Sequence, residues 1–156
     1  MNERAAALAL VMSLAGCTAG GVDASTTGSS AVSSITTVDV SIAAFGAQST
    51  PVGPALGYSP ASITIPVGSG VRFVNVDNTT HTVTAIPGAT TFPSVSPFTA
   101  SALQPGATSD LSGAWGAGAL QPGGASGVFV ANTAGTYLYG CFFHYSGGMR
   151  GVIIAR

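Results

Sequence analysis

Short stretches of alternating hydrophobic and polar residues dominate the chain from residue 35 onward. Val38, Val40 and Ile42 alternate with polar or small residues, and this period of two is typical of a half-buried β-strand. Similar short runs, bounded by turn-forming residues, occur at 63–65, 71–76, 82–84, 128–130, 136–142 and 152–155. Because no part of this region has the period of an amphipathic helix, the pattern predicts an all-β sandwich or barrel.

Residues 87–124 interrupt this pattern. They are rich in Gly, Pro, Ala and Ser, and the sequence Ala-Leu-Gln-Pro-Gly occurs at 102–106 and again at 119–123. Each Pro-Gly pair indicates a turn. Loops of this length inside a compact domain are usually functional or disordered. A partner-facing insertion and a tolerated low-complexity insertion, roughly within residues 87–113, both stay open, and the plain composition favours the second.

The first 34 residues differ from the strand-forming region. Residues 5–14 form an apolar stretch that is too short to span a bilayer and has the length of the hydrophobic part of a signal peptide. The stretch ends in Leu14-Ala15-Gly16-Cys17, which resembles a bacterial lipobox. The resemblance implies cleavage before Cys17 and acylation of that residue. An ordinary secretory signal that ends near a cysteine by coincidence is the alternative.

This N-terminal region predicts export and a membrane anchor. We expect a lipoprotein signal peptide over 1–16, a flexible tether over 17–34 with lipidated Cys17, and one domain over 35–156. Several acyl chains on one residue anchor a protein stably. The expected location is therefore extracytoplasmic, in the periplasm or at the cell surface. Thr18 after the cysteine favours the outer membrane if the cell is Gram-negative.

Charged residues are scarce. They make up 6% of the chain, compared with about 25% in an average globular protein, and the net charge is −1. Nucleic-acid binding requires a basic patch, so this composition argues against a nucleic-acid partner. It also argues against strong electrostatic steering of other partners.

The metal-binding side chains of the chain gather in one constellation. His81 and His144 are the only histidines, Cys141 is the only cysteine besides Cys17, and Met149 is the only methionine beyond the first 12 residues. Two imidazoles, one thiolate and one weak thioether are the ligand set of a blue-copper electron-transfer site. With Cys17 acylated, Cys141 has no disulfide partner, and a lone thiol in an oxidising compartment is a liability unless something binds it.

The sequence around these residues resembles the cupredoxins, the small blue copper proteins, and particularly the plastocyanin and amicyanin group. The segments that carry the resemblance are 63–68, 71–75, 81–84, 120–123 and 135–151, the last with a Cys-x2-His-x4-Met spacing. The resemblance implies a Greek-key β-sandwich that binds one copper ion. It further implies that His81, Cys141 and His144 are equatorial ligands and that Met149 is the axial ligand.

Two positions depart from the plastocyanin pattern. Gly140 replaces an aromatic residue that often precedes the cysteine and serves a second partner site, so that route is not expected here. Phe143 replaces a proline and keeps its amide N–H, which would raise the reduction potential if it reached the sulfur of Cys141. In the family, the histidine ligand that follows the cysteine on this loop lies at the surface inside an apolar patch and passes the electron. His144, flanked by Phe143 and Tyr145, fits that role.

His81 needs a partner for its second ring nitrogen. An imidazole that binds a metal through one nitrogen is oriented by an acceptor at the other. Asn75 and Asn78 precede His81 closely, and the sequence does not distinguish between them.

These observations predict a carrier of single electrons between extracytoplasmic redox partners, and no enzyme. Partners would bind at the apolar patch around His144, and Cys17 would hold the protein on the membrane. A protein for copper storage, delivery or tolerance would use the same ligands and is the main alternative. A metal-free adhesion module is a third interpretation, because Tyr139 lies two residues before a cysteine, as in the tyrosine corner of immunoglobulin-type sandwiches.

Other chemistry at these residues fits less well. A binuclear copper centre needs a second cysteine near Cys141, and a multicopper oxidase needs more than the two histidines present. A Cys–His nucleophile needs a further group to orient the base and leaves Met149 without a role.

Overall fold

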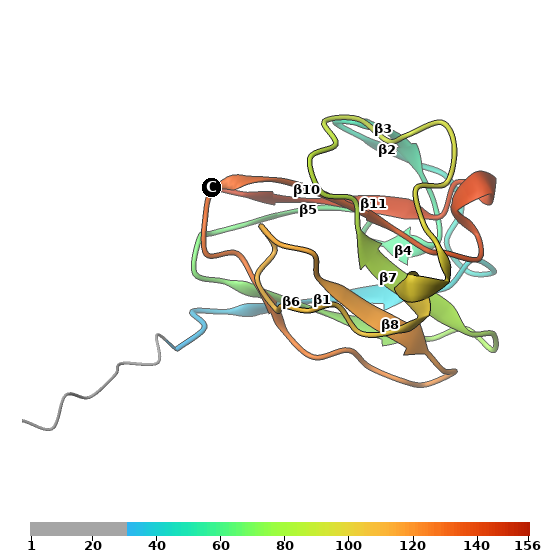
Figure 1. The fold of residues 1–156 in the computed structure, drawn as a ribbon, viewed down its shortest axis with the longest axis horizontal. Coiled ribbons are helices and arrows are strands. Elements are labelled where there is room, and N and C mark those ends of the chain that lie inside the picture. Colours follow the sequence, from blue (N-terminus) through green and yellow to red (C-terminus); the bar gives the residue numbers. More distant parts are fainter. Residues whose placement is uncertain (1–30) are drawn as a thin grey trace, which may run out of the picture.

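The computed structural model describes residues 31–156, and two β-sheets form the body of this part of the chain (Figure 1). The first sheet has the order β4 (Tyr58–Ser59), β1 (Ile35–Val40), β6 (Gly70–Asn75), β9 (Phe129–Val130). The second has the order β5 (Ser62–Ile65), β11 (Arg150–Ala155), β10 (Gly135–Gly140), β7 (His81–Ala85), β8 (Gly116–Leu120). The chain crosses repeatedly between the sheets, so the prediction of an all-β Greek-key sandwich is confirmed.

The direction of the strands places their ends. β1 runs parallel to β6, and β5 runs parallel to β11, whereas the other neighbouring strands of the two sheets are antiparallel. Because β7 and β10 are antiparallel neighbours, the start of β7 and the end of β10 lie at the same end of the sandwich. The loops at this end carry the site described below.

The main core lies between the two sheets and follows from the alternation in the sequence. Val38 and Val40 of β1 are fully buried, and so are Val71 and Phe73 of β6. Aromatic rings fill the centre of the core, where neighbouring ring centroids lie 4.7–6.3 Å apart; the members of this group are Tyr58, Phe73, Trp115, Phe129 and Tyr139. Large aromatic side chains contribute much of the burial energy of a core.

Tyr139 belongs to this core and does not form a tyrosine corner. Its hydroxyl group is buried and has no hydrogen-bond partner among residues 31–156. The ring packs edge-on against Tyr58 and Phe73, with centroid distances of 4.9 and 5.1 Å. The position of Tyr139 two residues before the cysteine therefore no longer argues for an adhesion module.

The structure contains elements that the sequence pattern did not predict. A small hairpin joins β2 (Gln48–Thr50) to β3 (Gly53–Ala55), and two short 3-10 helices occur, η1 (Ala100–Leu103) and η2 (Tyr145–Gly147). β8 lies within the irregular segment and pairs with β7. Its sequence, Gly-Ala-Gly-Ala-Leu, has none of the β-branched residues that favour strands. Its small residues instead allow another segment of the backbone to approach closely. Gly118 has φ of 67°, and a Cβ atom there would lie 2.9 Å from the backbone nitrogen of Pro105.

A second hydrophobic cluster covers the outer face of the second sheet. Side chains from the segment that follows β7 and from the β2–β3 hairpin pack against this face; the members on both sides include Val52, Ala89, Phe92, Phe98, Leu138, Tyr145 and Val152. Figure 1 shows this segment running beside β2 and β3, over β10 and β11. Residues 87–99 thus pack onto this sheet through the partly buried side chains of Ala89, Phe92 and Phe98.

The predictions for the N-terminus lie outside the described residues. They are the signal peptide over 1–16, acylation of Cys17 and most of the tether over 17–34. Within residues 31–156, none of the helices has the length and apolar character required to cross a membrane.

Candidate metal centre

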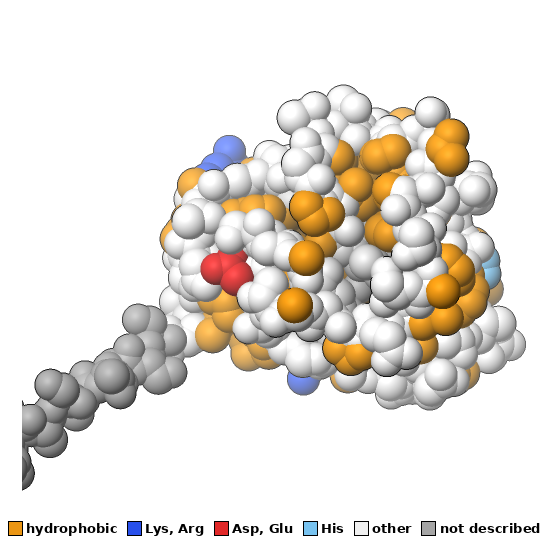
Figure 2. Space-filling model, viewed as in Figure 1, with side chains coloured by type: hydrophobic (Ala, Val, Ile, Leu, Met, Phe, Trp, Pro, Cys, Tyr) orange, Lys and Arg blue, Asp and Glu red, His pale blue; other side chains and the backbone are white. Residues whose placement is uncertain are grey.

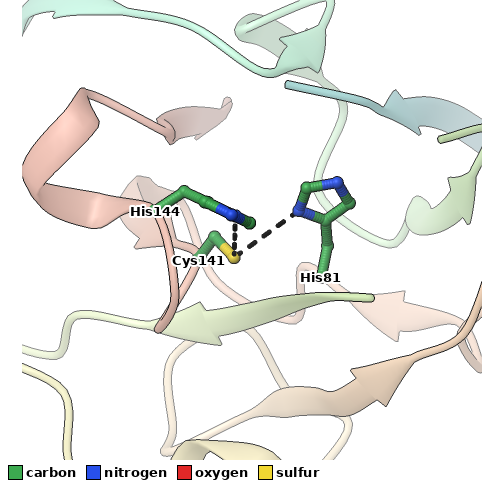
Figure 3. A group of neighbouring side chains, drawn as sticks. All are labelled: His81, Cys141 and His144. Carbon is green, nitrogen blue, oxygen red and sulfur yellow. Dashed lines mark hydrogen bonds between the residues drawn. The ribbon is translucent and has the colours of Figure 1, made fainter. Parts of the chain in front are cut away.

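Three potential metal ligands from two distant segments meet at one end of the sandwich (Figure 3). His81 is the first residue of β7, Cys141 directly follows β10, and His144 directly precedes η2. One ligand atom from each of the three residues lies within 4.8 Å of the other two. His81 and Cys141, which are 60 positions apart in the sequence, are thus brought together by the pairing of β7 with β10.

The distances in this group suit a single metal ion. The Sγ atom of Cys141 lies 3.8 Å from Nδ1 of His81 and 3.6 Å from Nδ1 of His144. For a first-row metal such as zinc, with bonds of about 2.3 Å to sulfur and about 2.0 Å to nitrogen, a trigonal arrangement separates the two atoms by about 3.7 Å. The donors are one soft thiolate and two imidazoles, which is the combination that copper prefers.

The loop between β10 and β11 is closed by its own backbone. The amide of Cys141 donates to the carbonyl oxygen of Met149 at 3.1 Å, and the amide of Met149 donates to the carbonyl oxygen of His144 at 3.2 Å. Gly148, with φ of 98°, makes the turn that returns the chain to β11. These bonds hold the loop that carries His144 against the strand ends next to Cys141.

Met149 is buried beside this group. Its side chain is fully inaccessible and belongs to the same core cluster as Cys141. Gly57 leaves room for it, because a Cβ atom at that position, where φ is 76°, would lie 3.2 Å from the sulfur of Met149. The role of Met149 as the axial ligand stays a prediction.

The sulfur of Cys141 accepts an amide hydrogen bond, but from a different residue than expected. The donor is the backbone N–H of Thr82, at 3.4 Å. Among residues 31–156, the amide of Phe143 makes no hydrogen bond to this sulfur. The hydroxyl oxygen of Thr82 also accepts a hydrogen bond from the amide of Phe142, at 2.8 Å. Thr82 therefore connects β7 to the ligand loop through two hydrogen bonds, one to the thiol and one to the next residue of the loop.

The partner of the second ring nitrogen of His81 was also not found from the sequence. Neither Asn75 nor Asn78 accepts from it. The nearest acceptors are Oδ2 of Asp77, at 3.1 Å from Nε2, and the hydroxyl of Thr79, at 3.2 Å. Asn75 instead braces the turn, since its side chain donates to the carbonyl oxygen of Thr79 and accepts from the amide of Asp77. The available signal in the sequence was the spacing of four residues between Asp77 and His81.

The electrostatics of the group favour the neutral form of His144. Burial, and next to it the ring of His81, lower the pKa of His144 below its ordinary value, while the carboxylate of Asp77 acts in the opposite direction. Burial also opposes ionisation of Asp77, but hydrogen bonds, first of all that with His81, hold the pKa of this carboxyl well below its ordinary range. A neutral imidazole is the form that binds a metal.

The two histidines differ in their access to solvent. His81 is completely buried, whereas His144 is partly exposed and Phe143 beside it is 47% exposed. The rings of Phe142 and Phe143 lie 5.2 Å apart, and that of Phe143 lies 6.1 Å from that of His144. We call Phe142, Phe143 and His144 the His144 face. In Figure 2, histidine surface lies beside hydrophobic side chains at one end of the molecule, and few charged side chains are in view.

The packed segment 87–99 contacts the ligand loop through Tyr145. This side chain is 2% exposed, and its hydroxyl donates to the carbonyl oxygen of Pro93 at 3.0 Å. Phe98 packs edge-on against the ring at a centroid distance of 5.4 Å, and the guanidinium of Arg150 lies over the ring, 5.6 Å from its centroid. The residue after His144 is therefore held by segment 87–99.

Several solved structures are similar to this chain. A purple cupredoxin from Nitrosopumilus maritimus is 21% identical, with a TM-score of 0.48 over 77% of this chain and 98% of that one. Oxidised plastocyanin from Dryopteris crassirhizoma is 24% identical, with a TM-score of 0.46 over 78% and 100%. Reduced auracyanin from Roseiflexus castenholzii is 21% identical, with a TM-score of 0.48 over 79% and 96%.

No curated protein matches the sequence. A family model does match, over residues 47–156, which is most of the chain and includes every residue of the candidate site. Its description is copper binding proteins, plastocyanin/azurin family. The sequence-based identification of a cupredoxin is thus confirmed: the chain belongs to the plastocyanin/azurin family of copper-binding proteins, and its cofactor is copper.

Proposed function

We propose that this protein is a type 1 copper protein that passes single electrons between extracytoplasmic redox partners, with His81, Cys141, His144 and Met149 as its ligands. Members of the family carry electrons and are not enzymes. The observation that carries the proposal is the buried thiol with one imidazole nitrogen at 3.8 Å and another at 3.6 Å. Bound copper would supply the one-electron couple between Cu(II) and Cu(I).

The residues of the chain divide the remaining work. His81 and Cys141 have no accessible surface, so they keep water away from the site and hold its geometry. The amide of Thr82 limits the movement of the sulfur through its hydrogen bond. Because these positions are determined by the core and by backbone bonds, the ligands need little rearrangement when the charge at the site changes. Met149 would act as the weak axial ligand that adjusts the potential.

The His144 face would be the contact surface for redox partners. It combines a partly exposed ligand with the exposed ring of Phe143 and lacks charged residues. Electron-transfer complexes are short-lived and use small interfaces. Because the chain has a net charge of only −1, its association with partners should depend weakly on ionic strength.

The N-terminus would hold the domain at a membrane. We propose that the signal peptide is removed before Cys17, that Cys17 is acylated and that a tether follows it, which ends where Ser33 and Ser34 hydrogen-bond to Gly68 and Gly70 of the domain. The lipobox-like sequence Leu14-Ala15-Gly16-Cys17 supports this arrangement. A tether would let the domain reach partners beside the anchor.

A Cu(II) titration followed by visible spectroscopy tests the site. We expect an intense thiolate-to-copper band that saturates at about one copper per chain, in keeping with a single ligand group. Cys141→Ser should abolish this band, and Cys17→Ser, which removes the other cysteine of the chain, should leave it intact. A colourless wild-type protein, or binding that ignores Cys141, would rule out the proposed function.

Redox cycling then separates a carrier from a copper-delivery protein. A carrier keeps its copper through repeated reduction and oxidation in the presence of a Cu(I) chelator. Loss of the metal on the first reduction would instead favour delivery, since both functions use the same ligands. The closed loop between Cys141 and Met149 supports retention, because its backbone hydrogen bonds hold the ligand-bearing loop in place.

A further inference from the structure

We propose that Asp77 positions His81 and lowers the reduction potential of the copper site, an inference that rests on the proposed function. The carboxylate oxygen Oδ2 lies 3.1 Å from Nε2 of His81, and the side chains of the two residues are 3% and 0% exposed. Asp77 is one of three side-chain carboxylates in residues 31–156, and the others, Asp39 and Asp110, make no hydrogen bond to a proposed ligand.

The surroundings of Asp77 are built for a carboxylate. Oδ2 accepts hydrogen bonds from the hydroxyl of Ser41 at 3.0 Å and from the amide of Ala43 at 3.3 Å. Oδ1 accepts from the amide of Asn78 at 2.7 Å. Every one of these groups donates, and an ionised carboxylate is the side chain that only accepts. The loop after β1 and the loop before β7 together stabilise the negative charge of Asp77 and fix the orientation of its carboxylate.

This arrangement determines the tautomer of His81. Because the carboxylate accepts, Nε2 carries the proton. Nδ1 is then the nitrogen left free to bind a metal, and it faces the sulfur of Cys141, at 3.8 Å. Figure 3 shows the ring of His81 with this nitrogen directed at the sulfur. The imidazole is thus oriented for ligation through Nδ1 without the metal.

The charge of Asp77 has a definite sign of effect on the potential. A negative charge held next to a ligand stabilises the more highly charged Cu(II) state relative to Cu(I). The carboxylate also makes the imidazole a more basic ligand, which again favours Cu(II). Both effects lower the reduction potential. Few other charges surround the site to oppose them, since charged residues are only 6% of the chain.

The first test needs no copper. In the metal-free wild-type protein, nitrogen NMR of the His81 ring should report a proton on Nε2 that exchanges slowly with solvent, because the site is buried. A mixture of tautomers, or a proton on Nδ1, would overturn the positioning role. This experiment does not depend on the function of the holoprotein.

The second test compares two variants with opposite expected signs. Asp77→Asn removes the charge and should raise the potential by about 59 mV, a tenfold shift in the ratio of Cu(I) to Cu(II). Ser41→Ala removes a donor to the same carboxylate and leaves its charge less neutralised, so the potential should fall slightly. Asp110→Asn is the matched control. It removes an equal charge from a hydrogen-bonded carboxylate that contacts Asn132 and Ser112, and it should leave the potential unchanged.

The signs decide between an electrostatic and a merely structural role. Both Asp77→Asn and Ser41→Ala weaken the same hydrogen-bonded loop, so general loosening would shift both potentials in one direction. Equal signs, or a shift in Asp77→Asn no larger than in Asp110→Asn, would overturn the inference. If Asp77→Asn does not fold, the sign in Ser41→Ala and the NMR of the wild type still decide. A blue wild-type protein with an unresponsive potential refutes this inference alone, whereas a colourless one refutes the proposed function.

Discussion

The two histidines of the copper site are held by opposite means. His81 lies at the start of a strand and has no accessible surface, and its second ring nitrogen is hydrogen-bonded to Asp77. His144 lies on the short loop between β10 and β11, next to the exposed ring of Phe143. In the proposed function, the buried half of the site would maintain the geometry and the exposed half would contact the partner.

The exposed half is nevertheless supported from behind. Tyr145, the residue after His144, is buried against the segment 87–99 through Phe98 and the carbonyl oxygen of Pro93. The buried half uses the core and a carboxylate, whereas the exposed half uses an insertion packed on the outer face of the second sheet. A ligand can therefore reach the surface while its loop stays fixed.

The largest expected effect comes from removing each imidazole in turn. His81→Gly and His144→Gly should both abolish the blue band, because each removes one of the strong ligands. Added imidazole should restore the band in His144→Gly, whose vacated position opens to solvent, and should fail to restore it in His81→Gly, whose position is completely buried. Visible spectra with and without imidazole make the measurement. Equal rescue of the two variants would break the comparison.

Truncation of Tyr145 should be the next largest effect. Tyr145→Ala removes a buried aromatic ring and should lower the free energy of unfolding by about 3–5 kcal/mol. Tyr145→Phe removes only the hydrogen bond to Pro93 and should cost about 1 kcal/mol. Urea unfolding of the metal-free protein measures both. Phe143→Ala, at an exposed position, is the control and should change stability by no more than about 0.5 kcal/mol. A Tyr145→Ala variant as stable as this control would remove the support assigned to segment 87–99.

Acid should weaken the buried half through Asp77. Hydrogen bonds hold the pKa of this carboxyl below its ordinary value of 3.8 in the folded protein. Its stabilising contribution is therefore present above pH 3.8 and is lost as the pH falls below that value toward the lower folded pKa. Asp77→Asn removes this contribution, so the stability of the metal-free variant should fall less steeply in this range, by about one bound proton. Denaturant unfolding at several acidic pH values tests the slope. An unchanged slope would show that Asp77 is not held as an ion.

The smallest effect on stability is expected at Met149. Met149→Leu conserves volume in a buried position and should cost less than about 1.5 kcal/mol. If the thioether is the axial ligand, its loss removes donation to Cu(II), and the potential should rise while the blue band persists. Voltammetry of the copper-loaded variant makes the measurement. A potential equal to that of the wild type would leave Met149 as a core residue only.

Strand prediction succeeded where side chains alternate. Val38 and Val40 in β1 and Val71 and Phe73 in β6 are inward-facing residues of the kind that the pattern identifies. β8 was missed because it consists of Gly, Ala and one Leu, and at Gly118 another backbone approaches too closely for a larger side chain. Period and propensity carry no information about such a contact.

In the site, too, the features that depend on sequence neighbours were predictable, and the contacts between distant segments were not. Cys141, His144 and Met149 share one loop, so their spacing alone indicated a common centre. The candidates that the sequence offered for the hydrogen bonds around them were other residues, since the donor to sulfur is Thr82 and the acceptor for His81 is Asp77. Each depends on the path of a loop between strands, which adjacent residue types do not specify.

The sequence by itself determined the family, the all-β class and the residues available to bind copper, because these follow from alternation and from a rare set of side chains at short spacing. Only the tertiary structure decided which groups surround them. The pairing of β7 with β10 brings His81 to Cys141, the loop before β7 turns Asp77 toward the imidazole, and the packing of segment 87–99 secures Tyr145. The physical reason is that burial and hydrogen bonding act between residues close in space, and distance along the chain does not record that closeness.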